Sequence, residues 1–187
     1  MMPNAETQSA TPHQQTVTIR ACTLADAAAL SRLAAETFSA TFIDTCTPED
    51  MGGFLRQYYN EPQLAKELAD PKHHIFFAEI DGQPVGYLQF SESLPPYDVS
   101  GVQRPLELFR LYVRSEWQGA GIAAALMGYY LEYARSNGYD YCWLGVWEHN
   151  YRARRFYTKH GFSFSGHTHP FPIGNTPQTD QWWGKLM

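Results

Sequence analysis

The residues with the clearest chemical signature are two closely spaced glycines, Gly119 and Gly121, in the segment 113–123, VRSEWQGAGIA. An apolar run precedes the segment and helical spacing follows it, which predicts a turn between a buried strand and a long helix. Glycine lets the backbone approach a ligand closely, and the free amides at the start of a helix bind phosphate or pyrophosphate. The segment therefore predicts an anion site, although a simple strand-to-helix turn would use the same glycines.

The form of this turn excludes two common nucleotide sites. It is not the GxGxxG pattern followed by an acidic residue that binds dinucleotides, and it lacks the GK[ST] sequence that binds nucleoside triphosphates. The expected ligand is therefore a different phosphate-bearing cofactor.

The elements that precede the turn can be read from their hydrophobic spacing. The first strand alternates apolar and polar residues, the first helix keeps apolar residues three and four apart, and Asp81-Gly82 is a strong hairpin signal. The expected elements are a strand at 16–21, helices at 24–42, 48–59 and 62–70, and strands at 74–80 and 84–91.

The second half of the chain alternates strands and helices. The expected elements are strands at 106–113, 141–147, 162–169 and 181–186, with helices at 121–137 and 150–160. Two parallel neighbouring strands need a crossover, and the helix at 121–137 can connect 106–113 with 141–147 in this way. We therefore predict an α/β (α+β) domain with a central mixed, mostly antiparallel sheet flanked by helices.

Length and composition bound the class of protein. The 187 residues allow one domain, expected at 16–187 after a polar, disordered tail at 1–15. A net charge of -5 argues against nucleic acid as a partner, and no apolar run is long enough for a membrane helix. Three widely spaced cysteines, Cys22, Cys46 and Cys142, make a poor disulfide framework and indicate a cytoplasmic protein.

Metal and thiol chemistry have little support in the sequence. The seven histidines include His73-His74 and the pair His167 and His169, but no cysteine or carboxylate cluster completes a metal site. The cysteines lack a readable arrangement with His and Asn, so we expect no metal and no thiol nucleophile.

Two motifs in order resemble the GNAT superfamily of acetyl-CoA-dependent N-acetyltransferases. Residues 118–123 fit its Q/R-x-x-G-x-G/A signature after a strand, and residues 150–162, NYRARRFYTKHGF, look like its N-x-x-A-x-x-F-Y-x-K-x-G-F segment. The resemblance covers about residues 16–187. It implies a single GNAT-like domain in which the strands 106–113 and 141–147 splay apart at the cofactor.

A looser resemblance points to bacterial spermidine/spermine-type N-acetyltransferases. It rests on Glu36-Thr37-Phe38, Thr41-Phe42, Pro48-Glu49-Asp50-Met51, Trp143 to Glu148 and Gln178-Thr179-Asp180. It implies direct transfer of the acetyl group to a small primary amine, with polyamines first. Protein N-termini and aminoglycoside-like amines are competing acceptors, and a catalytically degenerate, acyl-CoA-binding regulatory module is the alternative from another class.

The resemblance also implies where acetyl-CoA, the cosubstrate, would bind. Its pyrophosphate is expected at the amides of 118–123 and its pantetheine arm along 111–113. The expected cofactor-binding residues are Leu111, Tyr112, Val113, Gln118, Gly119, Ala120, Gly121, Ile122, Ala123, Asn150 and Tyr157. Asn150 is also a good N-cap for the helix that carries Tyr157.

Acetyl transfer to an amine needs a proton donor for the leaving sulfur and a proton acceptor for the amine. Tyr157 matches the family tyrosine that protonates the sulfur, although a tyrosine beside Phe156 could simply pack. Glu107 matches a position where several family members carry a general base, although a glutamate there could pair with an arginine instead. Glu148 and ordered water are the alternatives for the base.

Carboxylates and aromatic faces could accept a cationic substrate. The candidates are Glu36, Tyr58, Trp147 and Glu148, each of which could also have an ordinary core or surface position. The strand with Trp182 and Trp183 could pair across a dimer or close the domain's own core, and the resemblance favours a homodimer.

Overall fold

The computed structural model describes residues 16–187, and the expected tail at 1–15 lies outside this range. The first part of the chain contains β1 (Thr18–Ala21), α1 (Ala27–Phe42), α2 (Pro48–Tyr58), α3 (Glu61–Ala69), β2 (His73–Ile80) and β3 (Gln83–Glu92). The second part contains β4 (Pro105–Val113), α4 (Ile122–Ser136), β5 (Tyr141–Trp147), α5 (Tyr151–Lys159), β6 (Ser163–Pro170) and β7 (Thr179–Leu186).

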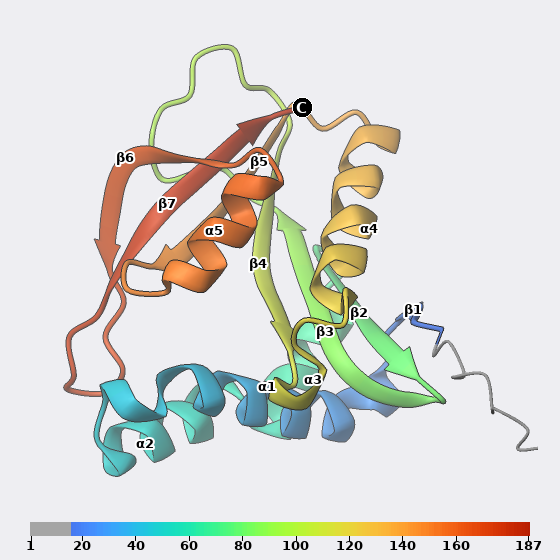
Figure 1. The fold of residues 1–187 in the computed structure, drawn as a ribbon, viewed down its shortest axis with the longest axis vertical. Helices are drawn as coiled ribbons and strands as arrows, with labels where there is room; N and C mark the ends of the chain where they lie inside the picture. Colours follow the sequence, from blue (N-terminus) through green and yellow to red (C-terminus); the bar gives the residue numbers. More distant parts are fainter. Residues whose placement is uncertain (1–15) are drawn as a thin grey trace, which may run out of the picture.

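The strands form one seven-stranded sheet in the order β1-β2-β3-β4-β5-β7-β6 (Figure 1). Among the strands of residues 16–187, only β4 and β5 pair in parallel, and α4 is the crossover between them. The predicted mixed, mostly antiparallel sheet and the parallel pairing of these two strands are therefore confirmed.

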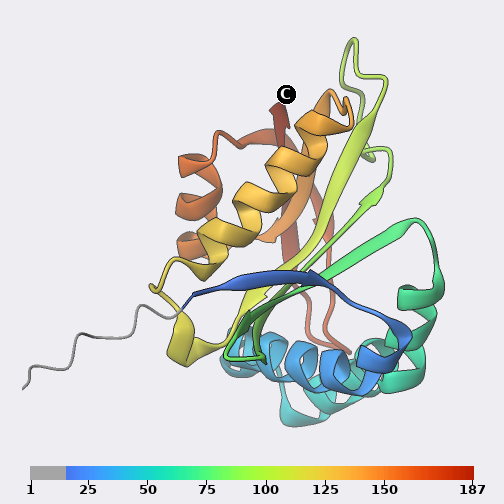
Figure 2. The same ribbon diagram turned by 90° about the vertical axis from the view of Figure 1, so that its right-hand side faces the viewer.

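Helices cover both faces of the sheet, so the domain has two cores. Helices α4 and α5 pack on one face, and α1, α2 and α3 gather on the other (Figure 2). Leu126 and Tyr130 of α4 are fully buried against the sheet, and Leu30, Phe38 and Leu64 are buried on the opposite face. Burial of these apolar stripes is the main force that holds the helices to the sheet.

Side chains cap three of the five α-helices in residues 16–187. Thr47 accepts a hydrogen bond from the amide of Asp50 before α2, and Asn60 accepts one from the amide of Gln63 before α3. Asn150 caps α5, as predicted.

The first helix and the last strand begin differently from the prediction. The helix expected from residue 24 begins as a 3₁₀ turn, Leu24–Asp26, and becomes α-helical at Ala27. The last strand was expected from residue 181 but begins at Thr179, because Thr179 pairs with Pro170 and Asp180 pairs with both His169 and Trp147. The polar stretch before Trp182 had the composition of a loop, and only its neighbours make it a strand.

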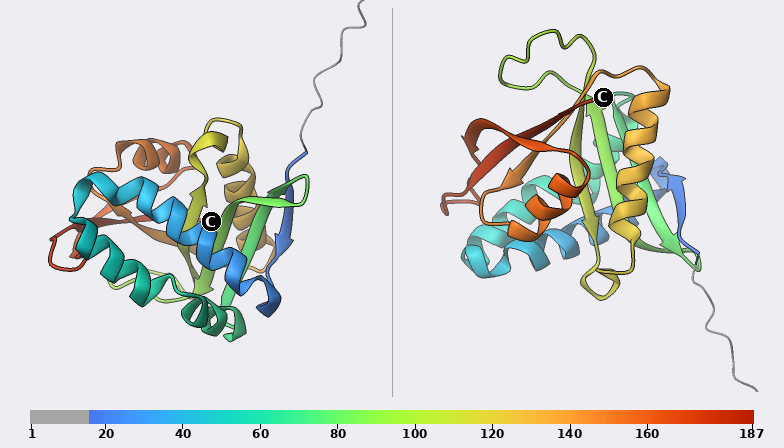
Figure 3. Two further views of the ribbon diagram at one scale, coloured as in Figure 1. Left: turned by 90° about the horizontal axis from the view of Figure 1, so that it is seen from below. Right: turned by 45° about the horizontal axis from the view of Figure 1, so that its top comes forward.

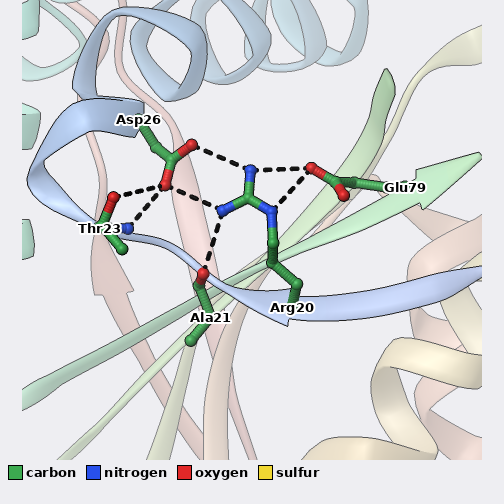
Figure 4. A network of polar contacts seen from close by, with 5 residues as sticks. All are labelled: Arg20, Ala21, Thr23, Asp26 and Glu79. Atoms are coloured by element: carbon green, nitrogen blue, oxygen red, sulfur yellow. Dashed lines mark hydrogen bonds and ion pairs between the residues drawn. The ribbon is translucent and has the colours of Figure 1, made fainter. Parts of the chain in front are cut away.

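A polar cluster fixes the start of the domain to the sheet edge (Figure 4). Arg20 of β1 binds Asp26 with two hydrogen bonds of 2.9 Å and also donates to Glu79 of β2 at 3.0 Å. Asp26 in turn accepts a hydrogen bond of 2.7 Å from the amide of Thr23. The Arg20 guanidinium, opposed by partial burial, lowers the pKa of Asp26 from 3.8 to about 2.

This cluster gives a pH-dependent prediction for Asp26→Asn. Because the pKa of Asp26 is lower in the folded chain, its charge stabilises the fold above about pH 4, and the contribution is lost as the pH falls toward about 2. Urea unfolding should show the variant less stable than the wild type near neutral pH, with a gap that closes in acid. Asp98→Asn, at an exposed residue without an ion pair in 16–187, is the control. A gap that stays constant with pH would contradict the account.

Candidate active site

The two parallel strands separate halfway along their length. β4 pairs with β5 only from Pro105↔Tyr141 to Leu108↔Leu144, although β4 continues to Val113 and β5 to Trp147. The right-hand view of Figure 3 shows β5 turning away from β4. Because an unpaired strand edge carries free N–H and C=O groups, an extended, amide-containing molecule can bind along β4 here. This is the predicted splay.

A β-bulge lies at the point of separation. Between β3 and β4 the register passes from Phe90↔Leu108 to Gln89↔Arg110, so Phe109 is an extra residue in β4. A bulge bends its strand and increases the local twist, which turns the end of β4 away from β5. The sequence carried a weak signal for it, since the adjacent apolar residues Leu108 and Phe109 break the alternation of a strand.

A cavity of about 1090 Å³ passes through the gap between the strands. Residues from both faces of the sheet line it: β4, the glycine turn, α4 and α5 on one side, and α1, α2, β5, β6 and β7 on the other. The cavity therefore has two parts, which we name the turn side, around Gly119 and Gly121, and the aromatic side. The residues of the aromatic side are Phe38, Phe42, Phe54, Tyr58, Trp147, His169, Phe171, Asp180 and Trp182.

The glycine turn has the properties of an anion site. Gly119 and Gly121 have φ angles of 93° and 85°, which disfavour a side chain, and a Cβ atom at either would meet no atom within 4 Å. Unlike α2, α3 and α5, helix α4 begins without a side-chain cap. Within residues 16–187 no backbone acceptor binds the amides of Ile122, Ala123 and Ala124. The turn thus presents open space and free donors to the cavity.

Side chains next to the glycine turn complete the wall of the cavity on this side. Gln118 donates to the Val113 carbonyl at 3.2 Å and accepts a hydrogen bond from Arg152 at the start of α5. Arg152 and Lys159 also line the cavity, so the wall carries positive charge beside the free amides. The amides, the charge and the unpaired edge of β4 together fit a phosphate group attached to an extended amide chain.

Most of the predicted cofactor residues meet at the cavity. Those that line it are Leu111, Tyr112, Val113, Gln118, Gly119, Gly121, Ala123, Asn150 and Tyr157. Ala120 and Ile122 do not line it. The side chain of Ile122, the first residue of α4, is buried in the core, so Ile122 can contribute only its backbone amide.

Tyr157 lies in the wall of the cavity, is 9% exposed, and packs its ring against Phe156 and Phe162. Its hydroxyl makes no hydrogen bond to any residue in 16–187. Burial, followed by the charge of Asp180, raises the pKa of the phenol above its ordinary value. Tyr157 is therefore protonated at neutral pH and free to donate.

The predicted carboxylates lie in different places. Glu107 lines the cavity, and burial raises its pKa against the effect of a hydrogen bond with Ser93. It forms none of the ion pairs within residues 16–187. Glu148 does not line the cavity and lies 3.8 Å from Nε2 of His149.

Of the other predicted substrate residues, two line the cavity and one does not. Tyr58 and Trp147 line the aromatic side of the cavity. Glu36 does not; it is 48% exposed and pairs with Arg114 at 3.3 Å.

The acidic residue of the aromatic side is Asp180, to which the sequence assigned no role of its own. It lines the cavity, and burial together with the charge of Glu148 raises its pKa to about 7. The sequence signal was its place in Gln178-Thr179-Asp180, one of the segments that resemble spermidine/spermine-type N-acetyltransferases.

Two further findings concern what the described chain lacks. No group of three or more His, Cys, Asp or Glu side chains in residues 16–187 could hold a metal ion. None of the helices in that range is long and apolar enough to cross a membrane.

A family profile and curated relatives of this chain both point to N-acetyltransferases. The sequence profile of the acetyltransferase (GNAT) family matches residues 29–162. An uncharacterised N-acetyltransferase from Lactobacillus delbrueckii subsp. lactis is 37% identical over 152 residues, which are 78% of this chain and 83% of that protein. One from Mycobacterium tuberculosis is 35% identical over 157 residues, covering 84% and 95%.

Solved structures share the fold at low sequence identity. The PaiA N-acetyltransferase from Thermoplasma acidophilum, in complex with coenzyme A, has a TM-score of 0.73 at 19% identity, covering 92% of this chain and 99% of that one. The ribosomal-protein-S18-alanine N-acetyltransferase from Escherichia coli has a TM-score of 0.68 at 16% identity, covering 91% and 94%.

Proposed function

The chain belongs to the acetyltransferase (GNAT) family, and from this premise we propose that it transfers an acetyl group directly to a small primary amine, with polyamines such as spermidine first. The chain is an acetyl-CoA-dependent N-acetyltransferase, with acetyl-CoA as its cosubstrate. The choice of acceptor is our proposal. The observation that carries it is the aromatic side of the cavity, where aromatic faces surround a carboxyl group.

In the proposed binding mode, acetyl-CoA supplies an activated acetyl thioester on the turn side of the cavity. The free amides of Ile122 to Ala124 bind its pyrophosphate, and the unpaired edge of β4 from Leu111 to Val113 binds the amides of its pantetheine arm. Arg152 adds positive charge near the phosphates. The acceptor enters from the aromatic side, so that the two substrates meet where β4 and β5 separate.

Two protons must move for the transfer to finish. Tyr157 donates its phenolic proton as negative charge develops on the leaving sulfur. Glu107 accepts the proton of the amine, directly or through water, and burial raises the pKa of its carboxyl, which makes the carboxylate a stronger base. Glu148 lies outside the cavity lining, so water is the stronger alternative for the base.

The alternative functions make different demands on the site. A protein or peptide acceptor would place an N-terminal amine in the same aromatic pocket, which fits the chemistry but needs room for a chain. A degenerate acyl-CoA-binding module would need no proton donor, whereas Tyr157 keeps a protonated hydroxyl without a partner in 16–187 at the cavity wall.

We expect Gly121→Ala to weaken coenzyme A binding by about tenfold or more, which is about 1.4 kcal/mol. The added methyl group occupies open space beside the free amides and strains a residue with a φ of 85°. Gly82→Ala is a matched control, because Gly82 has a φ of 73° and equally open surroundings but lies in the β2–β3 hairpin away from the cavity. Calorimetric titration with coenzyme A measures both. Equal affinities in the two variants would mean that Gly121 only makes the turn.

We expect Glu107→Gln to lower kcat by less than the roughly hundredfold typical of a general base, because water can replace the carboxylate. The loss should be greatest at low pH, where more of the amine carries a proton. The pH profile of kcat, measured by thiol release, tests this. An unchanged profile would assign the base to water or to Glu148.

The acceptor is tested with a panel of amines and acetyl-CoA, because each transfer releases one thiol. We expect turnover with spermidine and spermine, and an apparent KM for spermidine that rises with salt as carboxylate-to-ammonium contacts are screened. Thiol release with peptides but not with polyamines would overturn the polyamine proposal and leave the acetyltransferase activity intact.

The cytoplasmic location and the homodimer remain predictions. The three cysteines are free, in agreement with a reducing compartment. Trp183 of β7 is buried in the domain's own core, whereas Trp182 lines the cavity. Sedimentation of the purified chain would show whether it dimerises.

A further inference from the structure

Three side chains with unused polar atoms form a row across the sheet on the aromatic side of the cavity. Asp180 of β7 lies directly between Trp147 of β5 and His169 of β6 in the strand register. Opposed residues on neighbouring strands place their side chains on the same face, about 5 Å apart at Cβ. All three line the cavity.

Each member of the row has a buried polar atom that makes no hydrogen bond to the part of the chain that the structure describes. These atoms are Nε1 of Trp147, Oδ1 of Asp180 and Nδ1 of His169. Buried polar groups in native proteins are nearly always hydrogen-bonded, so an orphaned group needs an explanation. Trp147 Nε1 can only donate, whereas the Asp180 oxygen and the ring nitrogen of a neutral His169 can accept, so these two neighbouring acceptors suit a ligand that donates hydrogen bonds.

The surroundings of Asp180 determine the charge of that ligand. None of the ion pairs within residues 16–187 involves Asp180. The titratable groups near it are Glu148, Tyr157, Tyr112 and His169, of which Glu148 is an acid and the two tyrosines become negative when they ionise. The remaining neighbour, His169, is kept neutral because burial lowers its pKa. Asp180 is thus an acidic group that lacks a positive partner.

Trp182 and Asp180 pack closely over Gly145, and further aromatic rings lie beside them. A Cβ atom at Gly145 would lie 3.4 Å from Oδ2 of Asp180 and 2.9 Å from the Trp182 ring. The ring centroids of His169 and Trp182 are 3.9 Å apart, and those of Phe42 and Trp147 are 5.4 Å apart. Aromatic faces attract cations, and a single carboxyl among them supplies the specific contact.

We propose that Asp180 binds an ammonium group of the acceptor other than the amine that is acetylated, and holds it between the rings of Trp147 and His169. This inference rests on the proposed function, since it assumes that the acceptor is an amine. Asp180 is a binding and positioning residue, whereas Glu107 lies deeper, opposite Trp143, where β4 and β5 are still paired.

Binding of the ammonium group is linked to a proton. In the free protein the Asp180 carboxyl is protonated in about half of the molecules near pH 7, since its pKa is about 7. The carboxylic acid loses its proton to solvent, and the carboxylate then pairs with the ammonium group, which keeps its own protons. Amine binding should therefore strengthen as the pH rises through about 7 and release up to one proton below that pH.

Calorimetric titration of spermidine into the protein saturated with coenzyme A tests the inference without turnover. Buffers with different ionisation enthalpies report the protons released. We expect close to one proton at about pH 6 and nearly none at about pH 8. Asp180→Asn should abolish this proton release and weaken spermidine binding at about pH 8 by about tenfold or more.

Two further variants keep the experiment interpretable. Asp180→Glu retains a carboxyl group and should retain the proton release. Asp44→Asn removes the same charge from an exposed residue that does not line the cavity, and should behave as the wild type. Unchanged coenzyme A affinity in Asp180→Asn shows that the variant is folded.

Steady-state kinetics separate this inference from the proposed function. We expect the KM for spermidine to rise in Asp180→Asn by about tenfold or more while kcat changes by less than about threefold. Spermidine binding that is as tight in Asp180→Asn as in the wild type, or that releases no proton in the wild type, would overturn the role of Asp180. Absence of thiol release with every amine in the panel would instead overturn the proposed function.

Discussion

Replacing Tyr157 with phenylalanine should lower kcat by about a hundredfold to ten-thousandfold and leave coenzyme A affinity nearly unchanged. The ring of Tyr157 fills its place beside Phe156 and Phe162, and phenylalanine fills the same space. Only the hydroxyl is lost, and it is needed as charge develops on the sulfur. An interaction made only in the transition state affects kcat without a matching rise in KM.

Thiol release under saturating substrates measures this effect, and calorimetric titration with coenzyme A measures the affinity. Tyr129→Phe is the matched control, because Tyr129 lies on α4 against Phe76 and does not line the cavity. If Tyr157→Phe keeps most of the wild-type kcat, then Tyr157 only packs and the proton has another source.

The largest expected loss of stability comes from a buried ion pair under the cavity. Arg110 and Glu67 are 9% and 10% exposed, and Nη1 of Arg110 lies 2.5 Å from Oε2 of Glu67. Gln89 joins both, accepting from Arg110 at 2.7 Å and donating to Glu67 at 2.9 Å. Burial opposes the charge on Glu67, but Arg110 and Gln89 hold the pKa of Glu67 below its ordinary value.

Glu67→Ala leaves the Arg110 charge buried without its partner, and should lower the free energy of unfolding by about 3–5 kcal/mol. Glu132→Ala is the control, because Glu132 pairs with Arg135 on the surface and both side chains are more than 60% exposed, at 64% and 65%. That change should cost less than about 1 kcal/mol. Urea unfolding at neutral pH measures both, and equal losses would contradict the role assigned to the buried pair.

Local signals were enough to predict the elements and the turn side of the cavity. The hairpin at Asp81-Gly82 and the crossover helix α4 depend on residues that are close in sequence, and both are confirmed. The glycine turn could be recognised because its function requires residues at fixed spacing. The position of Tyr157 followed from the second motif, which the cap at Asn150 anchors to the start of α5.

Tyr58 and Trp147 of the aromatic side were among the predicted substrate residues, but its carboxyl group could not be predicted, because pairing between distant strands brings it there. Asp180 belongs to a polar stretch with the composition of a loop, and only its pairing with Trp147 and His169 makes it a strand residue in the cavity wall. Glu36 was predicted to bind substrate, but it does not line the cavity. A helical carboxylate near aromatic residues fitted a cation pocket, but its side chain pairs with Arg114 from the end of β4.

The most direct test of direct transfer in one cavity is an initial-rate experiment that varies acetyl-CoA and spermidine together. If both substrates bind in the gap between β4 and β5 before transfer, double-reciprocal plots should give lines that intersect. The wild-type protein incubated with acetyl-CoA alone should remain unacetylated by mass spectrometry. Parallel lines together with an acetylated protein would contradict the account, because they are the signature of an acyl-enzyme formed before the amine binds.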